Sequence, residues 1–383
     1  MPFFTPLDDN EKRPGRIALG VEYDGTRYCG WQRLSHAPSV QEALEKALSK
    51  VASTPITVHC SGRTDSGVHA VRQVVHFDTP VGRSRKAWRM GGNVNLLPDI
   101  GIHWAVPVPD DFHARFSAIA RRYRYMIINQ PFRPVMERNN VTWCREPLNV
   151  ADMQAAAAHL VGELDFSAFR AAGCQSRSPR RHVHFIEVSR HGHIVMIDIQ
   201  ANAFLHHMVR NIAGTLMAIG RGEKPVEWIV ELMRGGDRTR SSATAAATGL
   251  HFVDVIYPPR YALPKEPLGP GLVAHLGEWT GERPLPDCPM VRSRMARAEA
   301  EGAEEARAAG KLSEQEAIRL ANVAREAERL SREHEQAIPA AGVPAPGDPA
   351  AGDPAAGDPA AGDPAAGVED DTLTADTQNE SSR

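Results

Sequence analysis

Cysteine is scarce in this sequence, and no two cysteines stand close together. The 383 residues include five, at positions 29, 60, 144, 174 and 288, and no Cys-x-x-Cys pair occurs. A disulfide framework or a zinc knuckle needs closer spacing than this. We therefore expect reduced thiols and a cytoplasmic location, since disulfides persist mainly in oxidising compartments.

Long apolar runs are also missing. No stretch of eighteen or more apolar residues occurs, so we expect no transmembrane helix and no membrane partner. Residues 1–9 are acidic and contain two prolines, whereas a signal peptide begins with basic residues and continues with apolar ones. Export is therefore not expected.

The chain as a whole has little net charge, but its two parts carry net charges of opposite sign. The total is 44 Lys and Arg against 47 Asp and Glu, a net charge of −3. Residues 1–290 carry 34 basic and 28 acidic side chains, whereas residues 291–383 carry 10 and 19. A mildly basic body is thus followed by an acidic tail, and a basic body suits a polyanionic partner such as RNA.

Two kinds of tail sequence follow the body. Residues 291–336 are rich in Ala, Glu and Arg with a thin apolar stripe, which predicts a helical extension, either solvated or in a weak coiled coil. From Gly347 the unit Gly-Asp-Pro-Ala-Ala repeats four times. A proline at every fifth residue prevents helix and sheet ladders, so we expect residues 337–383 to be disordered.

The body shows the same order of elements twice. In residues 16–119, strands are predicted at 17–21, 56–60, 71–77 and 102–106, and helices at 40–51 and 85–92. In residues 120–264, strands are predicted at 123–128, 183–189, 194–199 and 250–256, and helices at 153–160, 205–219 and 226–233. Each half is a β-α-β-β-α-β unit. The expected fold is α+β: two ferredoxin-like halves form a mostly antiparallel sheet, with helices on one face and an RNA cleft on the other.

A short loop in the first half carries the strongest candidate for catalysis. Asp65 lies between Gly62 and Gly67 and between two predicted strands, where glycines permit tight turns and close approach of a ligand. Arg63 stands two residues away, on the same side of an extended chain, and can keep the carboxylate ionised as a nucleophile or base. The residues alone equally permit a hairpin loop with an Asx-turn and a solvated arginine.

The strand at 123–128 interleaves aromatic and basic side chains. Tyr123 and Tyr125 face one way, and Arg122 and Arg124 face the other. Tyrosines can stack on a base and arginines can bind phosphates. The competing interpretation is a buried tyrosine pair with an exposed basic edge that discourages aggregation.

The predicted helix at 205–219 contains adjacent histidines and an arginine. His206 and His207, placed on a helix, would point about 100° apart and could not share one ion, and no His-Glu-x-x-His motif occurs. No metal site is therefore expected. Arg210 lies off the apolar stripe of this helix and is available to a cleft or to solvent.

The sequence contains further basic runs, and each run by itself is expected to be a solvated loop. They comprise residues 177–181, residues 234–240, and the group Arg83, Arg85, Lys86 and Arg89. Together they could line a path for a nucleic acid. Signatures of a dinucleotide site and of a zinc deaminase are absent from the sequence.

Several segments, in this order, resemble the tRNA pseudouridine synthase A family. They are Leu19-Gly20-Val21-Glu22-Tyr23-Asp24-Gly25, Gly30-Trp31-Gln32-Arg33, Gly62-Arg63-Thr64-Asp65-Ser66-Gly67-Val68-His69, Asp111-Phe112-His113-Ala114-Arg115-Phe116, Arg121-Arg122-Tyr123-Arg124-Tyr125 and Asn202-Ala203-Phe204-Leu205-His206-His207-Met208-Val209-Arg210-Asn211. The resemblance runs from about Arg16 to Pro264. Ser66 stands where many members carry alanine, a small change that leaves the aspartate in place.

The resemblance implies a function and roles for named residues. It implies a two-fold homodimer, no cofactor, and conversion of uridine to pseudouridine at positions 38, 39 and 40 in the tRNA anticodon stem-loop. By position, Asp65 resembles the catalytic nucleophile and Tyr123 the residue that stacks on the target base. Arg63 and Arg210 resemble the basic partners of the carboxylate, and Leu250 an apolar wall of the pocket.

The chemistry itself requires no metal or redox group, because the reaction breaks the N1–C1′ bond, turns the uracil and joins C5 to C1′. One alternative is a non-catalytic tRNA-binding protein, which predicts a damaged Asp65 loop, whereas this loop is intact. Another is an aspartate-nucleophile hydrolase of small substrates, which would need neither Tyr123 among arginines nor dispersed basic loops.

Overall fold

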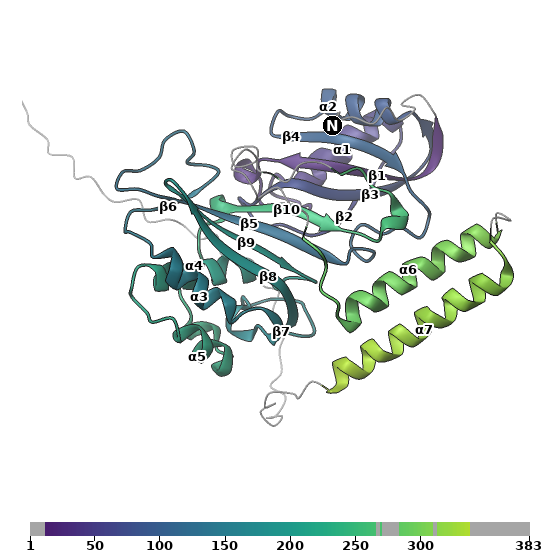
Figure 1. Ribbon diagram of the computed structural model, residues 1–383. Coiled ribbons are helices and arrows are strands. Elements are labelled where there is room, and N and C mark those ends of the chain that lie inside the picture. The colour runs from purple at the N-terminus through teal and green to yellow at the C-terminus, as the bar shows by residue number, and fades with distance from the viewer. Residues whose placement is uncertain (1–11, 266–268, 270–282, 309–311, 338–383) are drawn as a thin grey trace, which may run out of the picture. The chain divides into compact units, whose positions relative to one another are not determined.

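Strands from both halves of the body join into one sheet (Figure 1). The computed structural model describes residues 12–265, 269, 283–308 and 312–337. Its strands are β1 (Arg13–Tyr23), β2 (His59–Cys60), β3 (His69–Arg83), β4 (Ile100–Pro107), β5 (Ala120–Asn129), β6 (Thr142–Cys144), β7 (Gly162–Asp165), β8 (Arg180–His191), β9 (Ile194–Ala201) and β10 (Leu250–Ile256). Their order is β4-β1-β3-β10-β5-β9-β8-β7, with β2 paired to β3 and β6 to β5.

Each half has the strand order of a ferredoxin-like unit. The first half runs β4-β1-β3-β2 and the second β10-β5-β9-β8, the order that two interlocked βαβ units produce. Most neighbouring strands are antiparallel, whereas β5–β6 and β3–β10 are parallel. The expected α+β fold with a mostly antiparallel sheet is confirmed.

The parallel contact between β3 and β10 is the seam between the halves. It pairs His251 with His69 and Phe252 with Ala70. His69 is the first residue of β3 and follows the Asp65 loop by four positions. The seam therefore brings the Asp65 loop of the first half beside the start of β10 in the second.

Helices lie on one face of the sheet. They are α1 (Val40–Ala52), α2 (Gly92–Asn95), α3 (Val150–Ala158), α4 (Met208–Gly220) and α5 (Trp228–Gly235). Figure 1 shows α1 and α2 with the strands of the first half, and α3 to α5 with those of the second. Leu44 of α1 and Leu216 of α4 are fully buried in the same apolar cluster as Tyr125 and Ile127 of β5. Met126 points to the other face and belongs to a separate small cluster.

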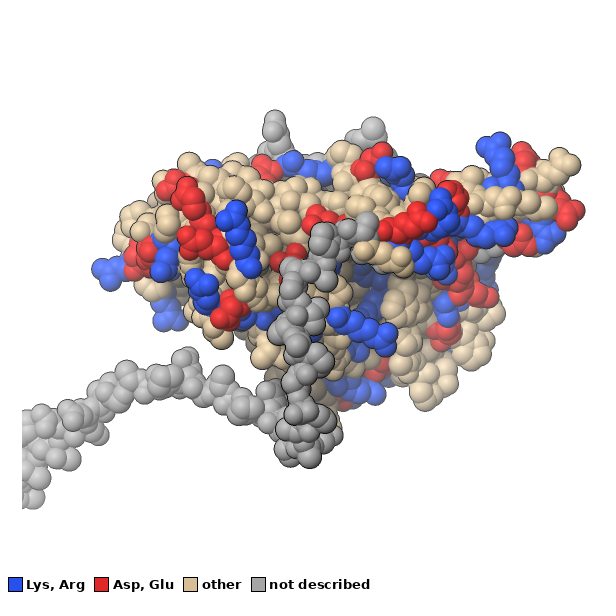
Figure 2. Space-filling view, turned by 90° about the horizontal axis from the view of Figure 1, so that it is seen from below, with Lys and Arg blue, Asp and Glu red and all other residues tan. Residues whose placement is uncertain are grey.

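The C-terminal extension forms two helices, α6 (Pro289–Ala308) and α7 (Glu314–Ala337), which pack against each other. Val291 of α6 packs on Ile119 of the body. Acidic and basic side chains are interspersed over this hairpin, as the right side of Figure 2 shows. Such mixed surfaces suit solvated helices. The disorder expected for the tail concerns residues 338–383, which lie outside the described residues. The division of the chain into residues 16–119, 120–264, 291–336 and 337–383 stays a prediction.

Some element bounds differ from the prediction. The predicted helix at 205–219 begins three residues later, at Met208. The strands β6 and β7 have three and four residues, too few to show an alternating pattern in the sequence. The predicted helix at 85–92 is helical from residue 85, but its central part, Ala87–Gly91, is π-helical, and it continues as α2 to Asn95.

Candidate functional site

The loop that carries Asp65 is tied to the segment after β1 by backbone hydrogen bonds. The Trp31 N–H donates to the carbonyl of Thr64 at 3.0 Å, and the Gly67 N–H donates to that of Tyr28 at 3.3 Å. These bonds lie on either side of Asp65. Its backbone is therefore fixed by a neighbouring segment of the chain and does not depend on its own turn alone.

Buried side chains of the sheet also form hydrogen bonds with this loop. The hydroxyls of Tyr23 and Thr64 are hydrogen-bonded at 2.8 Å. The amide of Gln73, which is fully buried, donates to the carbonyl of Gly62 at 2.7 Å and accepts from the N–H of Ser61 at 3.2 Å. Because β1 and β3 pair along their length, Tyr23 and Gln73 place the loop on the rigid part of the sheet.

Gly30 is a close neighbour of the Asp65 backbone. It has φ +87°, and a Cβ there would lie 2.7 Å from the carbonyl oxygen of Thr64 and 3.1 Å from the carbonyl carbon of Asp65. Both the backbone angle and the space require glycine. The second half of the body adds a contact, since Gly67 lies against the methyl of Ala247.

Three side chains from the start of α4 and the two residues before it surround the Asp65 carboxylate. His206 Nε2 lies 3.5 Å from Oδ1, His207 Nε2 lies 3.4 Å from Oδ2, and Arg210 Nη1 lies 3.5 Å from Oδ2. The Asp65 side chain keeps 25% of its surface exposed. All three distances exceed those of a good hydrogen bond, so the partners set the field around the carboxylate without occupying its oxygens.

The backbone before α4 explains why both histidines reach Asp65. His207 is the residue before the helix and has φ +59°, so neither histidine lies on the helix. Their ring centroids are 4.0 Å apart. The expectation that the two rings diverge by about 100° is wrong, because it assumed a helix that begins before His206. Burial lowers the pKa of the His207 imidazole, while the Asp65 carboxylate acts in the opposite direction.

Arg63 occupies a different position from the one expected. Its side chain is exposed, and among the described residues the ion pairs of Asp65 are made with His206, His207 and Arg210. The expected charge pair between Arg63 and Asp65 is therefore not formed. Arg210 fills that place, and its Nε also donates to the carbonyl of Ala245 at 2.8 Å.

Tyr123 lies near the loop with most of its ring covered. It is 8% exposed and packs at 4.9 Å from Phe204 and 4.8 Å from Phe252. A Cβ on Gly62 would lie 3.8 Å from its hydroxyl. Burial raises the pKa of the Tyr123 phenol well above its usual range, and the nearby Asp65 charge acts in the same direction. The phenol therefore stays protonated at neutral pH and can donate a hydrogen bond.

The tyrosine pair of the competing interpretation is buried, with Tyr123 8% and Tyr125 0% exposed. The exposed basic edge is wrong, because the side chains of Arg122 and Arg124 are 3% and 0% exposed. Arg122 makes two bonds of 2.7 Å to Asp198, and Arg124 makes one of 2.9 Å. They form a buried ion cluster between β5 and β9, where an arginine needs a paired carboxylate.

The candidate site lies on the side of the sheet that carries the helices. Tyr123 lies on that side with Tyr125, and one partner of Asp65, Arg210, belongs to α4. The expected position of an RNA cleft on the opposite face stays a prediction. Leu250, the first residue of β10, is 5% exposed and pairs with Tyr125 across the sheet.

One of the basic runs has an internal structural role. Arg238 donates to Asn211 Oδ1 and to Thr244 Oγ1, each at 2.9 Å. It therefore braces the loop that contains Ala245, whose carbonyl accepts from Arg210, and is not merely solvated.

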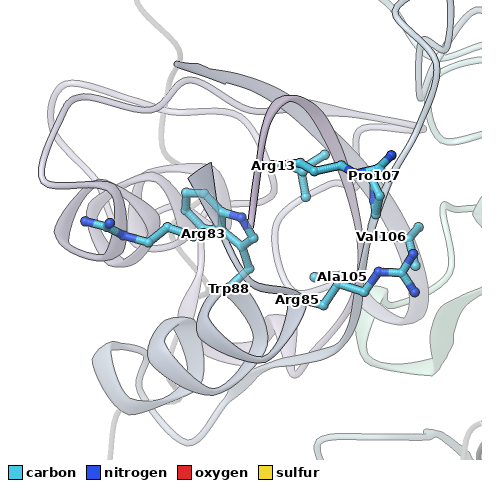
Figure 3. Close-up of a pocket in the computed structure, with 8 residues that line it drawn as sticks. Arg13, Arg83, Arg85, Trp88, Ala105, Val106 and Pro107 are labelled. Atoms are coloured by element: carbon cyan, nitrogen blue, oxygen red, sulfur yellow. The ribbon is translucent and has the colours of Figure 1, made fainter. Parts of the chain in front are cut away.

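At the far end of β3, Arg13, Arg85 and Trp88 border a small pocket (Figure 3). Its free volume of about 10 Å³ suits a single water. Figure 3 shows the Arg83 side chain pointing away from the other two arginines, and its Nε donates to the carbonyl of Val51. A larger pocket, of about 340 Å³, is lined by residues that include Arg72, Trp104 and Arg122. Gln73, which supports the Asp65 loop, lines the larger pocket, whereas Asp65, Tyr123 and Arg210 line neither of the two.

Comparison with known proteins finds relatives that match most of the body of the chain. The family model described as tRNA pseudouridine synthase matches residues 20–117 and 156–258. A tRNA pseudouridine synthase A of Vibrio cholerae serotype O1 is 58% identical over 255 residues, 67% of this chain and 97% of that protein. That of Hydrogenovibrio crunogenus is 55% identical over 65% of this chain and 95% of its own. That of Escherichia coli O1:K1 is 56% identical over 70% of this chain and its whole length.

The fold and the matched segments define the class as an RNA-modifying isomerase that acts on tRNA. The chain belongs to the tRNA pseudouridine synthase family. A solved Cbf5-Nop10-Gar1 complex is similar at a TM-score of 0.27 and 11% identity, over 62% of this chain and 48% of the other, which is too low to inform the fold. Within the described residues, no helix is long and apolar enough to cross a membrane.

Proposed function

We propose that this protein converts uridine to pseudouridine at positions 38, 39 and 40 of the tRNA anticodon stem-loop, with Asp65 as the nucleophile. The observation that carries the proposal is the state of the Asp65 carboxylate. It is partly exposed, fixed through its backbone, and surrounded by two histidines and an arginine at 3.4–3.5 Å. A carboxylate in this setting is oriented but still has oxygen lone pairs for an electrophilic carbon.

A second aspartate in the same chain shows the contrast. Asp198 accepts bonds of 2.7–2.9 Å from two buried arginines and is itself 6% exposed. Its oxygens are used by structural contacts. The longer and weaker contacts of Asp65 leave its oxygens available, which supports a chemical role for this aspartate.

Asp65 has two possible first steps on the ribose. It can attack C1′ as the N1–C1′ bond breaks, or it can remove the C2′ proton to give a glycal-like intermediate. Both need the target base flipped out of the helix so that the ribose reaches the carboxylate. Arg210 supplies a positive charge beside the carboxylate in either case and keeps it aimed at the sugar.

Tyr123 is proposed to hold the uracil while it turns. Its ring lies beside the loop, and its protonated phenol can donate to a uracil carbonyl. The raised pKa of this phenol argues against Tyr123 as the base that removes the C5 proton. Leu250, buried beside Tyr125, is proposed as an apolar wall that limits escape of the freed base.

Arg63 is proposed to bind the substrate backbone. It is exposed and, among the described residues, has no ion pair with Asp65, so its guanidinium can contact a phosphate of the flipped nucleotide. A cytoplasmic two-fold homodimer, in which one subunit positions the stem-loop for the other, completes the proposal.

Incubation of purified protein with unmodified tRNA tests the proposal directly. Mapping of pseudouridine should show the modification at positions 38, 39 and 40 and none with Asp65→Ala, while that variant still binds tRNA. Modification confined to other positions would reject the assigned target, and tRNA binding without any modification would support the non-catalytic alternative.

A further inference from the structure

Asp65, His206 and His207 form a cluster with the geometry of a metal site. One potential ligand atom from each residue lies within 4.8 Å of the others. The carboxylate oxygens lie 3.5 and 3.4 Å from the two Nε2 atoms. Ligands bound to one tetrahedral zinc ion at 2.0–2.1 Å stand about 3.3 Å apart. Small adjustments of the side chains would therefore bring all three to one ion.

The backbone at His207 makes this convergence possible. A residue with φ +59° that is not glycine adopts a sparsely populated conformation. It turns the chain between His206 and α4, so that the two rings lie 4.0 Å apart and face the same carboxylate. Adjacent residues of an α-helix could not do this.

The positive charges around the cluster oppose the binding of a cation. Arg210, at 3.5 Å from Asp65 Oδ2, repels a cation, and Arg238 adds a weaker positive field at His207. These charges predict modest affinity and a preference for ions that bind imidazole strongly.

We propose that Asp65, His206 and His207 bind one divalent transition-metal ion, such as Zn²⁺, and that the bound ion inhibits the enzyme. The ion would take the carboxylate oxygens that act on the ribose, leaving a fourth position for water. Binding depends only on the geometry of the cluster. Inhibition rests on the proposed function of Asp65, so the two parts need separate measurements.

The ligand set also predicts which ions bind. Two imidazoles and one carboxylate suit Zn²⁺, Ni²⁺, Co²⁺ and Cu²⁺, whereas Mg²⁺ prefers oxygen ligands and retains its water. We therefore expect no inhibition by the Mg²⁺ that accompanies tRNA. A nonspecific effect of divalent cations on RNA folding would not discriminate between the two ions in this way.

Binding is tested on the full chain, freed of metal with a chelator, by titration with Co²⁺ and displacement by Zn²⁺. The expected result is one ion per chain, with a visible absorption band of four-coordinate Co²⁺. His206→Ala and His207→Asn should each weaken Co²⁺ binding by roughly tenfold or more. Loss of a residue that only orients a metal ligand already lowers affinity by about tenfold, and these residues are the ligands themselves. Asparagine tolerates the left-handed backbone, so His207→Asn should fold as the wild type does.

His193→Ala, which removes an exposed histidine at the β8–β9 turn, is the matched control and should bind as the wild type does. Absence of a Co²⁺ band in the wild type would overturn the proposed site. So would Co²⁺ binding by His206→Ala and His207→Asn as tight as that of the wild type.

Inhibition is tested with tRNA at fixed Mg²⁺. Zn²⁺ should stop pseudouridine formation, and a chelator should restore it. Normal turnover with the metal site filled would overturn the inhibitory role. A wild type without activity even when metal-free would reject the proposed function instead, and the Co²⁺ titration would still decide whether the site exists.

Discussion

At the scale of single residues, the spacing of Asp65 between two glycines indicated a functional loop, and the structure supplies its surroundings. The partners of the carboxylate, His206 and His207, are 141 and 142 positions away in the sequence. No local pattern connects residues so distant. The sequence instead suggested Arg63, the nearest cation, which the structure leaves exposed.

Substitution of Tyr123 separates stacking from hydrogen bonding. Tyr123→Phe should retain more activity than Tyr123→Leu if the ring holds the uracil, because only the leucine variant loses the aromatic surface. Single-turnover rates at saturating tRNA are the measurement. Equal losses in the two variants would show that the hydroxyl, rather than the ring, is needed.

Substitution of the two arginines should affect different kinetic constants. Arg210→Ala should lower kcat, because its guanidinium lies beside the reacting carboxylate. Arg63→Ala should mainly raise KM and reduce the salt slope of tRNA binding by about 1, as expected for a lost phosphate contact. A fall in kcat alone for Arg63→Ala would contradict the assignment of this residue to the substrate backbone.

At the scale of elements, the site depends on segments that meet only in the folded chain. Patterns of apolar residues predicted β1, β3, β5, β8, β9 and β10, and the structure has a strand at each of these places. The start of α4 was placed three residues too early, and that small error concealed the histidine pair. The residue with a left-handed backbone just before α4 is His207. A sequence does not indicate such a backbone conformation at a residue other than glycine.

The contact of Gly30 with the Asp65 loop gives a prediction with a close control. Gly30→Ala would place a methyl 2.7 Å from the Thr64 carbonyl oxygen, so the loop must shift and kcat should fall by about 100-fold, as misplacement of a reacting group by about 1 Å does. Gly222 has a similar φ of +76° but open space around it. Gly222→Ala should therefore lose some stability and keep its activity.

Melting temperature and kcat for both variants give the comparison. If the two glycine variants lose activity equally, backbone strain and not displacement of the loop is responsible.

At the scale of the whole molecule, two similar halves were visible in the sequence as a repeated order of elements. The seam where β3 meets β10 was not, since a parallel contact between distant strands leaves no pattern in either strand alone. This seam brings together the Asp65 loop of one half and Leu250 of the other. The extension α6–α7 begins after residue 258, where the match to the family model ends.

The seam also contains a buried histidine that should make stability depend on pH. His251 is 2% exposed and stacks on His69 at 4.8 Å, and burial lowers its pKa to about 3. The unfolded chain takes up this proton below about pH 6.5, whereas the folded chain does not. Stability from this group is therefore complete above pH 6.5 and falls by about 1.4 kcal/mol per pH unit as the pH drops toward 3.

Urea unfolding at pH 7 and pH 5.5 measures this dependence. His251→Gln, which keeps a donor for the carbonyl of Asn140, should show a smaller loss of stability between the two values than the wild type. His193→Gln, at an exposed position, should behave as the wild type. An unchanged loss in His251→Gln would show that other buried histidines account for the acid sensitivity.

Assembly is the remaining expectation at this scale. Sedimentation of the active enzyme should show a dimer, and a monomer with full activity would contradict the proposed arrangement. Deletion of the residues after Met290 should increase the affinity for tRNA slightly at low salt, because the tail is acidic. An unchanged salt dependence would limit the tail to a role apart from RNA binding.

The role of Asp65 is tested most directly with tRNA labelled with tritium at C5 of uridine. Formation of pseudouridine releases the label from C5, so wild-type protein should release it in proportion to the uridines converted. Asp65→Ala and Asp65→Asn should release none above background while binding tRNA with nearly wild-type affinity, because we expect binding to come from dispersed arginines. Substantial tritium release by Asp65→Ala would contradict the assignment of this carboxylate as the catalytic group.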